Sequence, residues 1–98
     1  MDRRARNNYI RFWDIALRFA IIASDLNRAA YHRRYRVFLE RLRQARHDAH
    51  LTQVHVAGKL GRRQSFVSKC ESGERRIDVV ELQEFARLYG KSLEFFIG

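Results

Sequence analysis

Four side chains between residues 64 and 69 offer the chemistry needed to recognise DNA bases. Their hydrogen-bonding groups belong to Gln64, Ser65, Ser68 and Lys69. A glutamine amide can form two hydrogen bonds with adenine, and a lysine favours the acceptor atoms of guanine. The apolar residues of the same stretch, Phe66, Val67 and Cys70, fall on the other side of a helix predicted over 64–72. The stretch therefore predicts a helix with a polar, hydrogen-bonding face and an apolar face for the core.

A second short helix must precede this one to position its polar face. Thr52 can cap such a helix, because its hydroxyl can accept a free backbone N–H of the first turn. The buried face of the helix is predicted from Val54, Ala57 and Leu60. Gly61 can adopt the left-handed conformation that ends a helix. Two short helices joined by a tight turn form a helix-turn-helix, which presents its second helix to the major groove.

These segments together resemble a known family. The motifs that carry the resemblance are LTQ, Ala57, Leu60-Gly61, Gln64-Ser65 and VSKxExGE, followed by DVVELQEFARLYGKSLEFFI over 78–97. In this order and spacing they resemble the lambda-repressor and Cro-like (XRE-type) helix-turn-helix proteins over roughly residues 35–98. The resemblance implies an all-α fold: a five-helix lambda-repressor-like DNA-binding domain, to which this chain adds an N-terminal amphipathic helix.

The resemblance also implies which side chains meet DNA. Gln53 matches a glutamine that binds a phosphate, and it would lie in the first turn of its helix, where free N–H groups favour an anion. The base-reading positions of the family match Gln64, Ser65 and Lys69. The remaining candidate DNA contacts are Arg62, Arg63, Ser68, Ser72, Arg75 and Arg76.

Other positions matter for how the reading helix is held. The family carries an arginine–glutamate pair at the positions of Arg46 and Glu71, so we expect an ion pair that fixes the orientation of the reading helix. Arg63 stands where a serine or threonine normally caps that helix. Ile77 stands where proline is common, and His55 where an acidic residue is common. These departures bear on the DNA sequence that is read rather than on the fold.

Composition agrees with a basic, all-helical domain. The 98 residues hold 20 Lys and Arg against 11 Asp and Glu, and the formal net charge of +9 favours a polyanionic partner, either nucleic acid or an anionic membrane surface. There is no proline, the first glycine is Gly58, and strand-like alternation is absent. Cys70 is the only cysteine, which excludes an internal disulfide and suits a reducing cytoplasm.

Residues 9–30 lie outside the resemblance. Helical spacing places a heptad-spaced apolar stripe on Phe12, Ile15, Phe19, Ile22 and Leu26. A narrow polar stripe opposite it holds Arg11, Asp14, Arg18 and Asp25, and between the two lie Trp13, Leu17 and Ile21. The apolar arc is wider than a surface helix needs. Three interpretations stay open: the helix packs on its own domain or forms a dimer interface, it lies on a membrane or a protein partner, or it is an extension without a cellular role.

We therefore divide the chain into residues 1–30, a basic tail with an apolar helix, and 31–98, the helix-turn-helix domain. Ser24 and Asp25 predict a bend and the start of a new helix. The inner face of the following helix is expected from Tyr31, Tyr35, Phe38, Leu42, Ala45 and Ala49. The last two helices are expected to be capped by Asp78 and Ser92. Their inner faces are expected from Val79, Leu82, Phe85, Ala86, Tyr89, Leu93, Phe96 and Ile97.

Other chemistry is not indicated. The spacing of His47, Asp48, His50 and His55 matches no strong zinc signature, so no metal is expected. No nucleophile–base pair or glycine-rich phosphate loop is recognisable, so neither an enzyme nor a cofactor is expected, and the apolar run is too short and charged to span a membrane.

The sequence predicts a cytoplasmic, sequence-specific transcriptional regulator, a repressor that binds double-stranded DNA as a homodimer. The alternative is an antitoxin-like module that binds a protein partner through residues 9–26 and regulates its own operon.

Overall fold

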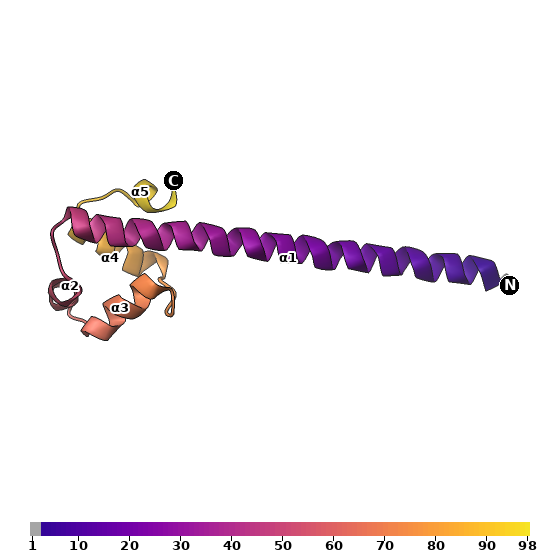
Figure 1. Cartoon of the computed structure of the whole chain (residues 1–98), viewed down its shortest axis with the longest axis horizontal. Helices are drawn as coiled ribbons and strands as arrows, with labels where there is room; N and C mark the ends of the chain where they lie inside the picture. The colour runs from indigo at the N-terminus through magenta and orange to yellow at the C-terminus, as the bar shows by residue number, and fades with distance from the viewer. Residues whose placement is uncertain (1–2) are drawn as a thin grey trace. The chain divides into compact units, whose positions relative to one another are not determined.

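The computed structural model describes the backbone of residues 3–98 and the side chains of residues 14–98. Within this part of the chain there are five helices and no strand: α1 (Arg3–Asp48), α2 (Gln53–Leu60), α3 (Gln64–Ser72), α4 (Val79–Tyr89) and α5 (Leu93–Ile97) (Figure 1). The predicted all-α fold is confirmed. The chain divides into two compact units, Met1–Arg33 and Arg34–Gly98, and the second contains the helix-turn-helix.

Helix α1 runs without interruption through Ser24 and Asp25, so the predicted bend there is wrong. Both residues have only a modest penalty inside a helix, and neither a proline nor a glycine occurs before Gly58 to break it. The additional N-terminal helix and the first helix of the domain are therefore one element. The side chains of residues 1–13 lie outside the described part of the chain, so the places predicted for Phe12 and Trp13 on the helix are not tested.

The starts of the later helices are set by the residues predicted to cap them. The Thr52 hydroxyl accepts the His55 N–H at 3.2 Å, and the Ser92 hydroxyl accepts the Phe95 N–H at 3.4 Å. Asp78 forms a complete capping box. Its carboxylate accepts the Glu81 N–H at 2.7 Å, while the Glu81 carboxylate accepts the Asp78 N–H at 3.0 Å.

A left-handed residue follows each of α1 to α4: His50, Gly61, Gly73 and Gly90. His50 follows α1 with a φ of 57°, a region that histidine tolerates better than a branched residue would. Gly73 ends α3 with a φ of 83°. A Cβ atom at Gly73 would lie 2.8 Å from Cδ1 of Leu39, so a larger residue would strain the left-handed backbone and would also force the Leu39 side chain to shift.

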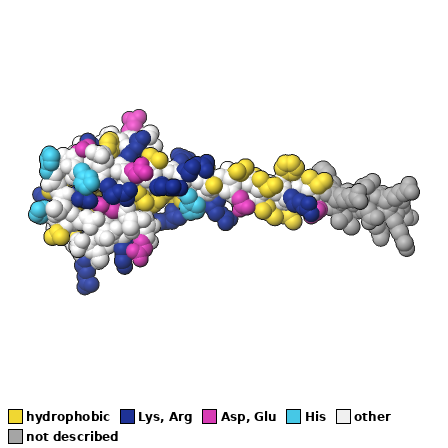
Figure 2. All heavy atoms as spheres, in the orientation of Figure 1, with side chains coloured by type: hydrophobic (Ala, Val, Ile, Leu, Met, Phe, Trp, Pro, Cys, Tyr) yellow, Lys and Arg dark blue, Asp and Glu magenta, His cyan; other side chains and the backbone are white. Residues whose placement is uncertain are grey.

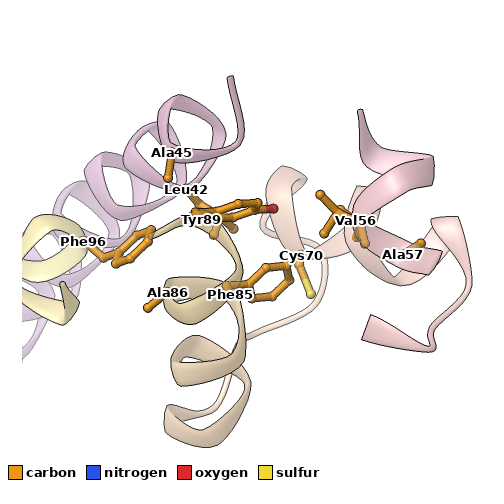
Figure 3. Close-up of a cluster of buried hydrophobic side chains, with 10 residues drawn as sticks. Leu42, Ala45, Val56, Ala57, Cys70, Phe85, Ala86, Tyr89 and Phe96 are labelled. Atoms are coloured by element: carbon orange, nitrogen blue, oxygen red, sulfur yellow. The ribbon is translucent and has the colours of Figure 1, made fainter. Parts of the chain in front are cut away.

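The core of the unit Arg34–Gly98 draws side chains from every helix (Figure 3). Its buried members are Leu42, Ala45, Val56, Ala57, Val67, Cys70, Phe85, Ala86, Tyr89 and Phe96. Phe85 lies between two rings, stacked on Phe66 with centroids 6.2 Å apart and on Tyr89 at 5.9 Å. Burial raises the pKa of the Cys70 thiol, which packs as a small apolar group. This core places α2 and α3 against α4.

Five positions predicted to be buried are exposed instead: Tyr31, Val54, Val79, Leu93 and Ile97. In α2 the buried residue is Val56, which is 0% exposed, whereas Val54 is 62% exposed. An eight-residue helix has barely two turns, so Val54 and Val56 both fit a face with Ala57 and Leu60. Only the packing of α2 on its neighbours selects between them.

No helix in the described part of the chain is both long enough and apolar enough to cross a membrane.

Candidate nucleic-acid interface

The two faces of α3 differ as the sequence predicts. Val67 and Cys70 are fully buried in the core. On the other side Gln64, Ser65 and Lys69 are exposed to solvent. The helix therefore presents a short row of hydrogen-bonding side chains while its apolar face holds it in place.

Gln64 is held by a glutamine from α2. Its Nε2 donates to Oε1 of Gln53 at 3.3 Å, and Nε2 of Gln53 in turn donates to Oε1 of Glu71 at 3.2 Å. The Gln64 side chain is exposed, and this hydrogen bond uses only one of its two N–H groups, which leaves Oε1 and the second N–H for another molecule. One acceptor and one donor are what a glutamine needs to bind adenine at N6 and N7.

Glu71 is also anchored by the expected partner, Arg46. The arginine Nε donates to Oε2 at 2.7 Å and its Nη2 donates to Oε1 at 3.0 Å, while the two side chains are only 13% and 3% exposed. The hydrogen bond to Glu71 is the main reason that the pKa of Arg46 lies above its ordinary value. Arg46 also donates to the Leu51 carbonyl at 3.1 Å. The pair thus joins α3 to α1 and to the loop that precedes α2.

A second charged cluster lies around Phe66. Arg75 forms two hydrogen bonds of 2.9 Å with the Glu81 carboxylate, and its guanidinium lies 4.7 Å from the Phe66 ring centroid. Arg62 lies 4.6 Å from the same centroid and 3.9 Å from Glu81. The bond from Arg75 lowers the pKa of Glu81, which is almost fully buried. Arg75 therefore has a structural partner that its position in the sequence did not reveal.

The remaining candidates differ in how firmly they are held. Arg63 is exposed at the N-cap of α3 and makes no side-chain cap hydrogen bond. The Ser72 hydroxyl donates to the Lys69 carbonyl at 3.1 Å and so satisfies a backbone acceptor in the last turn of α3. Arg76 is exposed, with its guanidinium 5.3 Å from the ring centroid of Tyr35. Ser68 is half-buried.

The start of α2 offers a place for a phosphate. Gln53 is the first residue of this helix, directly after its cap Thr52. The first amides of an α-helix have no partner within the helix, and the helix dipole adds positive potential there. The N-terminus of α2 and the Gln53 side chain thus lie together beside Gln64.

Comparison with known proteins agrees with this geometry. A helix-turn-helix domain family model matches residues 37–94, which is more than half of the chain. An XRE-family like protein from Pseudomonas syringae pv. tomato str. DC3000, of known structure, is 43% identical, with a TM-score of 0.66. The alignment covers 68% of this chain and 82% of that one. The chain belongs to the XRE family of helix-turn-helix proteins. No curated protein sequence matches it.

The DNA-binding domain of this XRE-family protein brings its candidate residues into two groups. One contains Gln53, Gln64 and their support from Glu71. The other contains Arg62, which precedes α3 in the sequence, and Arg75, which follows it; both guanidinium groups lie over the Phe66 ring. Sequence reasoning missed Glu81, although Asp78 followed by glutamate three residues later is the pattern of a capping box. Among residues 14–98, no three His, Cys, Asp or Glu side chains gather as a metal site would require.

Proposed function

We propose that this XRE-family protein is a cytoplasmic, non-enzymatic transcriptional repressor that reads double-stranded DNA with α3 and binds its operator as a homodimer. The observation that carries the proposal is the exposed Gln64, whose Nε2 donates to Oε1 of Gln53 at 3.3 Å. A side chain positioned before DNA arrives loses less conformational freedom on binding, which favours a specific contact.

The proposed contacts divide into reading and anchoring residues. Gln64 and Lys69, with Ser65, read base edges in the major groove. Gln53 and the N-terminus of α2 bind a phosphate. Arg63 and Arg76, both exposed, add charge along the DNA backbone. Arg62 and Arg75 contribute charge next to the reading helix while they also pack on Phe66.

A dimer on a two-fold-related site would place two reading helices about 34 Å apart, one turn of B-DNA, and the half-sites would be spaced accordingly. Repression needs only that the bound protein occupies the operator.

The test begins with selection of a preferred DNA sequence by the purified protein. Gln64→Ala should weaken binding to the selected site by about 1–3 kcal/mol and relax preference at one base position. Arg76→Ala should weaken the selected and a scrambled site about equally and reduce the salt slope by roughly one unit. Gln83→Ala, the same change at an exposed glutamine of α4, is the matched control. Equal losses on both DNAs for Gln64→Ala would show that α3 does not read bases.

A second candidate function rests on the exposed apolar residues of the unit Met1–Arg33. Ile15, Leu17 and Phe19 are 53%, 60% and 70% exposed. An antitoxin-like protein would cover such residues with a partner and regulate its own operon. Co-purification of a small protein that is lost when residues 9–26 are removed would favour this function, whereas clean footprinting by the protein alone favours the first.

A further inference from the structure

The apolar stripe of α1 is uncovered in the single chain. Ile15, Phe19, Ile22 and Leu26 are 53%, 70%, 55% and 65% exposed. Figure 2 shows hydrophobic side chains gathered along this part of the helix. Four large apolar side chains in one row form a patch of the kind that marks an interaction surface.

The row has the spacing of a coiled coil. Successive steps of four, three and four residues place Phe19 and Leu26 at heptad positions a, with Ile15 and Ile22 at positions d. The positions that flank the seam are asymmetric. On one side the e positions hold Ala16, Ala23 and Ala30, and on the other the g positions hold Arg18, Asp25 and His32.

We propose that this stripe pairs with the same stripe of a second copy of the chain, with the two helices antiparallel. In the register that fits, Ile15 packs on the partner's Leu26 and Phe19 packs on the partner's Ile22. The two-fold axis repeats both contacts, so every exposed apolar residue of the row is covered. The inference rests on the proposed function in one respect, that the protein is a homodimer. It does not depend on base reading by α3, because α3 lies outside the unit Met1–Arg33.

Charge complementarity selects this arrangement. In an antiparallel pair, g positions face g positions, and the register above sets Arg18 beside the partner's Asp25 and Asp25 beside the partner's Arg18. Among residues 14–98, no ion pair involves Asp25, and Arg18 is joined to Asp14 by one 3.2 Å contact that leaves further N–H groups. Both carboxylate and guanidinium are thus available for the partner.

The other side of the seam fits as well. In the antiparallel register Ala16 lies beside the partner's Ala23, and side chains this small let two helices approach closely. A parallel pair would instead place Arg18 beside the partner's Ala23, without a charge partner. It would also set Arg33, the next a position, against its own copy, and like charges at a seam repel. A membrane surface is a poorer fit, because the polar stripe carries Asp14 and Asp25 rather than lysine and arginine alone.

The first measurement is the mass of the full chain in solution without DNA, by sedimentation over a range of concentrations. The proposal expects a dimer. Ile22→Asp should raise the dimer dissociation constant at least hundredfold, since it places a charge in the apolar seam. Leu17→Asp is the control: Leu17 is 60% exposed at the outward f position and should leave the mass unchanged. A monomeric chain, or an equal effect of the control, overturns the proposal.

A charge exchange separates antiparallel from parallel pairing. Arg18→Asp and Asp25→Arg should each weaken the dimer by about 3- to 30-fold at low salt, and the double variant should recover most of the loss. Within one helix the two positions are two turns apart and do not meet, so recovery requires the partner. Additive losses in the double variant overturn the antiparallel register.

Disulfide trapping tests the same register directly. Ile15→Cys and Leu26→Cys chains, mixed and oxidised, should give mainly the mixed disulfide, whereas a parallel pair would join each variant to itself. Cys70 is 0% exposed, and the unaltered chain gives the background. Both experiments are read without DNA, so a failure here is distinguishable from a failure of Gln64 to read bases. A dimer that forms by another surface would give neither disulfide and would overturn the inference.

Discussion

Removal of Arg46 should be among the most damaging single substitutions in the helix-turn-helix unit. The Glu71 side chain is 3% exposed, and two of its hydrogen bonds, of 2.7 and 3.0 Å, come from Arg46. Arg46→Met would leave a buried carboxylate with only the Gln53 amide as a side-chain donor. Breaking a buried pair by removing one partner costs about 3–5 kcal/mol. Since small domains are stable by about 5–15 kcal/mol, this loss is a large share of the total.

The charge left behind, rather than the lost contact, should account for most of that cost. Replacing both partners, as Arg46→Met with Glu71→Leu, removes the uncompensated charge and should recover part of the stability lost by Arg46→Met alone. The unfolding free energy of the single and double variants is measured by urea titration with circular dichroism. Arg87→Met, at an exposed arginine of α4, should stay within about 0.5 kcal/mol of the original chain. A loss below about 1 kcal/mol for Arg46→Met, or a double variant worse than the sum of the singles, would refute the reasoning.

Three further substitutions test how the unit is held together. Arg63→Thr should raise the unfolding free energy by about 0.5–2 kcal/mol, because it supplies the missing cap of α3; denaturation and a DNA titration show whether affinity falls as stability rises. The Arg75 hydrogen bond lowers the folded-state pKa of Glu81 from its ordinary value, so the stabilisation is fully present above that ordinary value and is lost as the pH falls through the folded-state pKa. Glu81→Gln should therefore flatten the acid limb of a stability–pH profile, and an unchanged limb would contradict the assignment. Tyr35→Phe should lower the unfolding free energy by about 0.5–1.5 kcal/mol, because it removes the hydroxyl that accepts the Ile77 N–H at 3.2 Å, and an unchanged urea titration would contradict this.

The local chemistry of the chain was readable from its residues. Thr52, Asp78 and Ser92 cap helices because a short side chain can reach the free amides of the next turn, and that requires no distant partner. The resemblance to the XRE family placed Arg46 opposite Glu71, and the structure contains this ion pair. Gln64 and Lys69 lie exposed on α3 because Val67 and Cys70 on its other face are buried.

Features that depend on how separate elements pack could be established only from the tertiary structure. Val54 and Val56 are equally apolar, and only the packing of α2 on the other helices makes Val56 the buried one. The Arg75–Glu81 pair is another example. Its members are only six positions apart, but Arg75 also lies beside Phe66 of α3, and neither contact follows from helical spacing because Arg75 is in the loop after α3.

The sequence by itself determined α2 to α5, most of their ends and the exposed, polar face of α3, because these follow from interactions within a few residues. The tertiary structure decided which of two possible faces of a short helix is buried. It also decided that Gln53 connects Gln64 to Glu71. These outcomes depend on contacts between segments whose spacing along the chain carries no information about their distance in space.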